Sequence, residues 1–123
     1  MSTALVIEDN MDNMLLISDI LEANGYTVLQ AETGIQGVAM AEEYIPDFII
    51  LDIQLPDIIG NEVLAIIRRK EKTQHIPVVA MTSYAMAGDR ERLLAAGCDG
   101  YVEKPIDPGS VIKQLQKAIE GKI

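Results

Sequence analysis

The chain has 123 residues, of which 49% are hydrophobic and 24% charged, a length and balance that predict one globular domain. Its 19 acidic and 10 basic residues leave a net charge of −9, which disfavours direct binding to nucleic acid or to a membrane surface. No apolar run approaches the ~20 residues of a membrane helix. No signal peptide is recognisable and the single Cys98 excludes an internal disulfide, so we expect a cytoplasmic protein.

Five short apolar runs alternate along the chain with five helical patterns. The runs cover residues 4–7, 27–31, 48–51, 77–81 and 100–102. The third and fourth runs are continuously apolar, which is typical of strands buried on both faces of a parallel sheet. Regular alternation with right-handed crossovers predicts an α/β fold, a doubly wound five-stranded parallel sheet with helices on both faces.

Capping and turn residues mark the ends of the predicted helices. Asn10 is a predicted N-cap of the first helix, which ends before Gly25. Thr33 and Gln36 predict a capping box at the start of the second helix. The fourth helix is expected to end at Gly97.

The last helix has the clearest sequence pattern. Asp107 and Pro108 supply a predicted cap and first-turn proline. Its apolar stripe consists of Val111, Ile112, Leu115, Ala118 and Ile119. No linker, repeat or low-complexity segment interrupts the chain, so residues 1–123 are expected to form one domain without an output domain.

Polar side chains lie at or directly after four of the predicted strands. In chain order they are Glu8 and Asp9, Asp52, Thr82 and Ser83, and Glu103 and Lys104. Because sites in open α/β sheets form at the carboxyl ends of the strands, we expect three carboxylates, a hydroxyl and a lysine to gather at one edge.

Any one of these residues alone is better explained as a solvated side chain or a helix cap. The joint pattern differs, because three crowded carboxylates repel one another and favour a hard divalent cation. Lysine and threonine suit the oxygens of a phosphoryl group. Together they predict a Mg²⁺-assisted phosphoryl-transfer site in which a carboxylate is the nucleophile.

At these positions the sequence resembles the receiver domains of two-component response regulators, over the whole chain. The matching residues are Glu8 and Asp9, Asp52, Thr82 and Ser83, Lys104 and Pro105, and the segment from Asp52 to Pro56 with Gly60. The opening Val6-Ile7-Glu8-Asp9-Asn10 with Asn13 is most similar to single-domain receivers of the DivK and CheY kind and to receivers of hybrid kinases. The resemblance implies a flavodoxin-like strand order, 2-1-3-4-5.

The resemblance also implies a role for each residue of the site. Asp52 would accept a phosphoryl group from a phosphohistidine of a histidine kinase or a histidine phosphotransfer protein. Mg²⁺ would be held by Glu8, Asp9, Asp52 and the backbone carbonyl of Gln54. Lys104 would pair with the phosphoryl oxygens.

Further residues would transmit or time the signal. Thr82 and Tyr101 would move together as the switch, and Pro105 would follow a cis peptide bond. Gln54 and Tyr84 would modulate hydrolysis of the phosphorylated Asp52, with Tyr84 slowing it. The resemblance implies signalling to a downstream protein, by contact or by onward phosphotransfer, and self-modification rather than enzymatic turnover.

The first helix carries apolar residues outside its predicted core face. That face consists of Leu16, Ile17, Ile20 and Leu21. Met11 and Leu15 fall on the other side beside Ser18, either as stray surface residues or as a docking site for the phosphodonor, and the resemblance favours docking. His75 is expected to be a solvated loop residue and Cys98 a buried thiol.

Three other functions remain open at this point. A receiver fold used as a constitutive interaction surface would not need an intact site. A phosphatase of the haloacid dehalogenase type needs a second aspartate at position 54, where this chain has Gln54. A flavodoxin would need a phosphate-cradling loop and stacking aromatic residues, neither of which the sequence supplies.

Overall fold

The computed structural model describes residues 2–53, 55, 57, 58, 60–82, 89–104 and 106–120, except for the side chains of residues 89 and 90. Strands and helices alternate, as the sequence predicts. In chain order they are β1 (Thr3–Ile7), α1 (Met11–Ala23), β2 (Thr27–Ala31), α2 (Gly34–Tyr44), β3 (Phe48–Asp52), α3 (Gly60–Arg69), β4 (Val78–Thr82), α4 (Asp89–Ala95), β5 (Gly100–Glu103) and α5 (Val111–Glu120).

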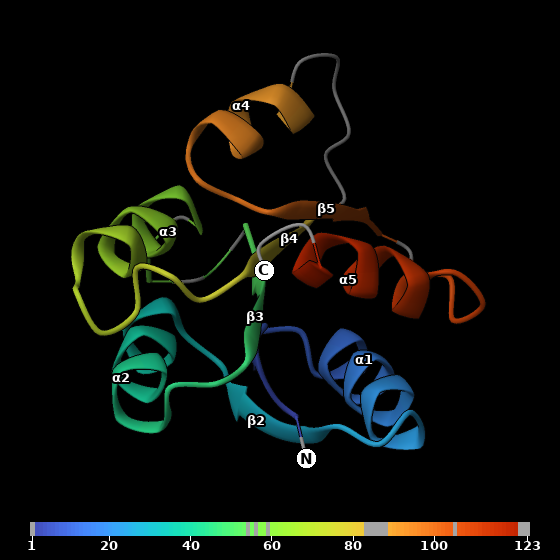
Figure 1. Ribbon diagram of the computed structural model, residues 1–123. Coiled ribbons are helices and arrows are strands. Elements are labelled where there is room, and N and C mark those ends of the chain that lie inside the picture. The colour runs from blue at the N-terminus through green and yellow to red at the C-terminus, as the bar shows by residue number, and fades with distance from the viewer. Residues whose placement is uncertain are drawn as a thin grey trace.

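The five strands form one parallel sheet in the order β2-β1-β3-β4-β5, which confirms the predicted fold class and strand order. The chain begins with β1 inside the sheet, adds β2 on one side and then places β3 on the other (Figure 1). The direction of winding therefore reverses between β1 and β3. Sites in such sheets form beyond the carboxyl ends of the strands at this reversal.

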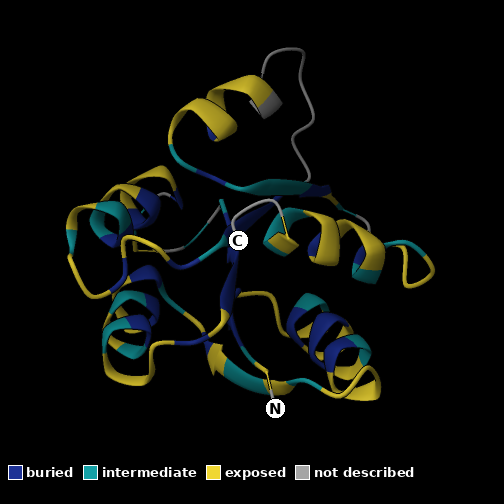
Figure 2. Ribbon diagram, viewed as in Figure 1, coloured by how far each residue is buried: buried dark blue, intermediate teal, exposed yellow. Residues whose placement is uncertain are grey.

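Helices cover both faces of the sheet, and each face has its own hydrophobic core (Figure 1). Leu5 and Ile7 point to the side of α2, α3 and α4, whereas Ala4 and Val6 point to the side of α1 and α5. Figure 2 shows the buried central strands between helices whose outer surfaces are exposed, while the outer strands β2 and β5 are only partly buried. Each buried Leu or Ile contributes ~1.5–3 kcal/mol, so the central strands form a firm support for the residues at their ends.

Several element boundaries differ from the prediction. Asp52 and Thr82 are the last residues of β3 and β4 instead of following them. The helix α5 begins at Val111, because the carboxylate of Asp107 accepts hydrogen bonds from the Gly109 amide and the Ser110 hydroxyl and stabilises a turn there. The prediction that Pro108 opens the helix was therefore wrong by one turn.

The core face of α1 also differs from the prediction. Leu16 is 37% exposed, whereas Ser18, which the pattern placed on the outer side, is 2% exposed. The buried positions are Met14, Ile17, Ser18 and Leu21. Ser18 is tolerated inside because its hydroxyl accepts a hydrogen bond from the Gln30 side-chain amide of β2 at 3.0 Å.

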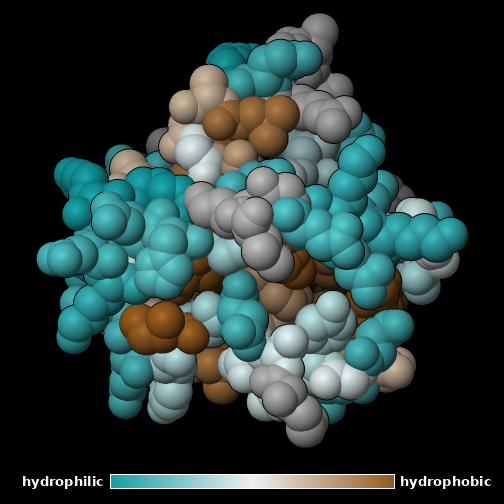
Figure 3. Space-filling model, viewed as in Figure 1, coloured by the Kyte–Doolittle hydropathy of each residue, from teal (hydrophilic) through white to brown (hydrophobic). Residues whose placement is uncertain are grey.

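The surface in the view of Figure 3 is mainly hydrophilic, with a hydrophobic area over α4. Leu94 of α4 is a large apolar side chain that is 40% exposed. Within the described ranges, the helices are too short and too polar for any of them to cross a bilayer.

Candidate functional site

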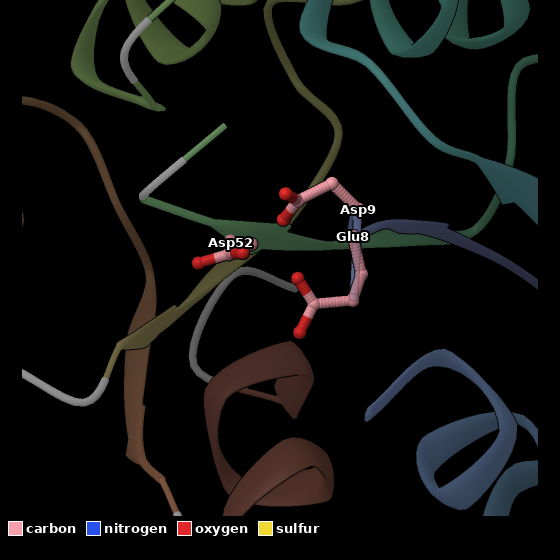
Figure 4. Close-up of side chains that lie close together, drawn as sticks. All are labelled: Glu8, Asp9 and Asp52. Atoms are coloured by element: carbon pink, nitrogen blue, oxygen red, sulfur yellow. The ribbon is translucent and has the colours of Figure 1, made fainter. Parts of the chain in front are cut away.

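The ends of β1 and β3 bring three carboxyl groups together. Ile7 of β1 is paired with Leu51 of β3, so the residues that follow leave the sheet at the same level. Glu8, Asp9 and Asp52 each have a carboxylate oxygen within 4.8 Å of the other two. Figure 4 shows Glu8 and Asp9 leaving the end of β1 on opposite sides and Asp52 lying beside them on the neighbouring strand. The predicted convergence of the three acids is confirmed.

The acids differ in burial, and Lys104 approaches the two that are buried. Glu8 is 1% and Asp52 2% exposed, whereas Asp9 is an exposed residue. The ammonium nitrogen of Lys104 lies 2.8 Å from Oε1 of Glu8 and 3.4 Å from Oδ2 of Asp52. Lys104 thus pairs with two of the three carboxyl groups, and its one positive charge is smaller than the combined negative charge of the three acids.

The carboxylate of Glu8 has room for a further partner. Neither of its buried oxygens has a hydrogen-bond partner among the described residues, although Lys104 stands at ion-pair distance from Oε1. The contact between Lys104 and Oε1 of Glu8 is therefore an ion pair without the geometry of a hydrogen bond. A buried carboxylate oxygen without a partner is costly. Carboxylate oxygens are the ligands that Mg²⁺ prefers, so these residues fit such an ion.

Strands β4 and β5 deliver the hydroxyl and the lysine to the same edge. Thr82, 3% exposed, lies one position beyond Met81, which is paired with Asp52. The Lys104 amide donates to the Thr82 carbonyl at 2.9 Å, so the two residues are joined through their main chains. Tyr101 is paired with Ala80 and packs, half-buried, on the sheet face covered by α2, α3 and α4.

The loop after Asp52 contains an acidic residue that the sequence reasoning did not single out. The Asp57 carboxylate accepts hydrogen bonds from the amides of Ile35 at 2.9 Å and Gly34 at 2.8 Å, at the start of α2. These bonds, from Ile35 first and then from Gly34, hold the pKa of Asp57 below its usual value. Its proximity to α2 follows from tertiary packing, and the only local signal was an acid inside a turn.

Part of the predicted site lies outside the described residues, namely Gln54, Ser83, Tyr84 and Pro105. The backbone ligand, the second strand-end hydroxyl, the two hydrolysis modulators and the cis peptide bond therefore stay predictions. Met11 and Leu15 are 52% and 50% exposed, as expected for side chains off the core face. His75 is exposed in a turn and Cys98 is buried, which confirms both expectations.

Known proteins share this arrangement of strands and helices. A family model of the response regulator receiver domain matches residues 4–116. The polar-differentiation response regulator DivK of Brucella ovis is 40% identical over 114 residues, which are 93% of this chain and 93% of that protein.

Solved structures agree with these sequence matches. The receiver domain of a sensor histidine kinase from Pseudomonas aeruginosa, with a magnesium ion coordinated in its active-site cleft, has a TM-score of 0.88 and 35% identity, over 97% of this chain and 98% of that one. The chemotaxis protein CheY4 of Vibrio cholerae has a TM-score of 0.89 and 26% identity, over 96% and 98% of the two chains.

The family match extends from β1 into α5. The acidic cluster lies at the carboxyl ends of the strands, where binding sites form in folds of this kind. Neither a haloacid dehalogenase phosphatase nor a flavodoxin accounts for both observations. The chain belongs to the response regulator receiver domains, the signalling modules of two-component systems.

Proposed function

We propose that Asp52 accepts a phosphoryl group from a phosphohistidine, with Mg²⁺ held by Glu8, Asp9 and Asp52. The observation that carries the proposal is the convergence of three carboxyl groups, with Lys104 at ion-pair distance from the two that are buried. In this transfer a P–O bond to Asp52 forms while the P–N bond of the donor breaks, and the imidazole nitrogen keeps the electron pair. The domain modifies itself and does not turn over a substrate.

The described residues suit the separate parts of this chemistry. Asp52 ends the central strand, so its main chain is held in place during attack. Lys104, already 3.4 Å from the Asp52 carboxylate, would neutralise the oxygens of the arriving phosphoryl group. When bound, Mg²⁺ would offset the charge of the carboxylates and the phosphoryl oxygens. The magnesium ion in the Pseudomonas aeruginosa receiver supports this choice of metal.

The same geometry supports a switch at the ends of β4 and β5. Phosphorylation would add about −1.5 to −2 charges beside Lys104. The Thr82 hydroxyl could then turn toward the new oxygens, and Tyr101 could move inward on the α4 side. Since the Lys104 amide is bonded to the Thr82 carbonyl, movement at one strand end is passed to the other. The output would be contact with a downstream protein or onward phosphotransfer.

The proposed donor is a histidine kinase or a histidine phosphotransfer protein that docks beside α1. Met11 and Leu15 are half exposed, and α1 begins two residues after Asp9. The exposed Leu16 enlarges this apolar surface. The free thiol of Cys98 is consistent with a cytoplasmic setting, where such donors act.

Labelling with acetyl phosphate in the presence of Mg²⁺ tests the proposal. Mass spectrometry should find one phosphoryl group per chain in the wild type and none in Asp52→Asn. Asp12→Asn is the matched control, because it removes the same charge from the exposed first turn of α1 and should label normally. Release of phosphate without accumulation of labelled protein would indicate a phosphatase. Full label in Asp52→Asn would indicate another acceptor, and no label in any variant would indicate a constitutive interaction module.

A further inference from the structure

The start of α2 is held by an acid from a different part of the chain. In the first turn, the amides of Gly34 and Ile35 donate to the two oxygens of Asp57, at 2.8 and 2.9 Å. The next amide, of Gln36, donates to the hydroxyl of Thr33 at 3.1 Å, which is an ordinary local cap. We call the pairing of Asp57 with Gly34 and Ile35 the Asp57 clamp. It joins the β3–α3 loop to α2 across 22 and 23 residues of sequence.

The clamped loop begins directly after the proposed phosphoacceptor. Its first residue, Ile53, donates to the Met81 carbonyl of β4 at 3.2 Å, and the Gly60 amide returns to the Ile53 carbonyl at 2.9 Å. A side chain at Gly60 would come within 2.5 Å of the Ile53 Cα, so the two ends of the loop are tightly closed. Among the described residues between these ends, Asp57 makes the charged contact that fixes the loop to another element.

Packing beside the clamp shows that the loop and α2 are fitted closely. A Cβ added to Gly34 would lie 2.5 Å from Cγ1 of Ile58, so the main chain of α2 approaches the loop where only glycine leaves room. A carboxylate at a helix N-terminus is favoured by the unpaired amides and the helix dipole. Because Asp57 is exposed, solvent weakens this attraction.

We propose that Asp57 is a positioning residue that fastens the loop following Asp52 to α2 and so holds the metal site in its binding geometry. This inference rests on the proposed function, because the site it serves is the one formed by Glu8, Asp9 and Asp52. By linkage, a clamp that favours Mg²⁺ binding must itself be favoured by bound Mg²⁺. Metal binding at the end of β3 would therefore tighten the first turn of α2.

Two measurements on four proteins test this coupling. Calorimetric titration gives the Mg²⁺ affinity of the wild type, Asp57→Ala, Asp57→Asn and Thr33→Ala. Amide hydrogen exchange followed by NMR gives the protection of Gly34 and Ile35 with and without Mg²⁺. Thr33→Ala is the matched control, because it removes a cap from the same turn of α2 without releasing the β3–α3 loop.

We expect Asp57→Ala to weaken Mg²⁺ binding by about 2- to 5-fold, the range of a charged group at a helix end. Asp57→Asn keeps one acceptor oxygen, so its Mg²⁺ affinity should lie between those of the wild type and Asp57→Ala. If Asp57→Ala does not fold, the affinity of Asp57→Asn tests the positioning role. Thr33→Ala should bind as the wild type does. Mg²⁺ should slow exchange of the Gly34 and Ile35 amides in the wild type and leave it unchanged in Asp57→Ala.

The contrary results are distinct from one another. Wild-type affinity in both Asp57 variants, or equal weakening in Thr33→Ala, overturns the positioning role and leaves the metal site intact. If bound Mg²⁺ does not change the exchange rates of the Gly34 and Ile35 amides in the wild type, the coupling between the clamp and the metal site is overturned. A wild type that does not bind Mg²⁺ at all overturns the proposed metal site and the role of Asp57 with it.

Discussion

Lys104 is the residue on which the charge balance of the site depends. Its ammonium group stands between Glu8 and Asp52, whose side chains are 0% and 2% exposed. Removing one partner of a buried ion pair costs about 3–5 kcal/mol, because the remaining charge stays buried. We expect Lys104→Met to lose stability of this order in metal-free buffer and to gain more stability from Mg²⁺ than the wild type gains. Urea denaturation with and without Mg²⁺ measures both effects.

A second lysine provides the control for that experiment. Lys113 lies on the exposed side of α5, so Lys113→Met changes the net charge equally and should alter stability by less than ~0.5 kcal/mol. Equal unfolding curves for Lys104→Met and Lys113→Met would mean that the acids do not depend on Lys104.

Cys98 should be chemically inert while the protein is folded. Burial raises the pKa of its thiol above the ordinary value of 9.0. The thiolate is the nucleophile, so at pH ~8 the folded protein contains less of it than the unfolded chain does. Alkylation by iodoacetamide should therefore be slow and should accelerate only with the urea concentrations that unfold the domain. Labelling of the native protein at the rate of a free thiol would show that Cys98 is accessible.

At the scale of the elements, Arg68 joins α3 to the segments that precede β4 and β5, at the end of the sheet opposite the acids. From the end of α3 its guanidinium donates to the carbonyls of Gly97, Gln74 and Ile76 and to the Asp99 carboxylate, at 2.7–3.0 Å. Arg68→Lys cannot reproduce this fork of donors, and we expect a loss of about 2–4 kcal/mol in urea denaturation.

Arg69 is the matched control for the Arg68 prediction. It is the next residue of α3 and is exposed, so Arg69→Lys should change stability by less than ~0.5 kcal/mol. Because Arg68 lies near the amino ends of β4 and β5, Arg68→Lys should still be labelled by acetyl phosphate while it remains folded. A stability equal to that of Arg69→Lys would show that the guanidinium contacts contribute nothing.

The sequence was informative where the local pattern decides the structure. Continuous apolar runs predicted the strands, and the polar residues ending them predicted the acidic cluster, because parallel strands align their carboxyl ends. Contacts between residues far apart in the sequence could not be predicted in the same way. The burial of Ser18 depends on Gln30, and the clamp at Asp57 depends on the packing of α2, and neither pairing leaves a periodic signal.

A similar limit applies to the backbone. Ile45 ends α2 with φ 44°, a left-handed conformation that is rare for a β-branched residue. Glycine or asparagine would have marked such a helix end in the sequence, and isoleucine does not.

At the scale of the whole molecule, the acidic cluster opens beside an apolar and acidic face of α1. Met11, Leu15 and Leu16 are 52%, 50% and 37% exposed, and the exposed Asp12 and Asp19 accompany them. With a net charge of −9, the chain suits a partner whose docking surface is apolar with a basic margin. A donor bound there would stand next to Asp9 and the end of β1.

Replacing Met11 and Leu15 together with serine separates docking from chemistry. Acetyl phosphate is small and needs no protein interface, so its labelling of Asp52 should be unchanged in the double variant. Transfer from the cognate histidine kinase should slow by at least ~10-fold, since truncating interface anchors costs more than ~1 kcal/mol each. Tyr44→Ser, which removes a 54% exposed side chain from the far end of α2, is the control and should accept phosphate from both donors at the wild-type rate. Equal loss with both donors in the double variant would show that Met11 and Leu15 support the fold, because a docking surface affects only the donor that touches it.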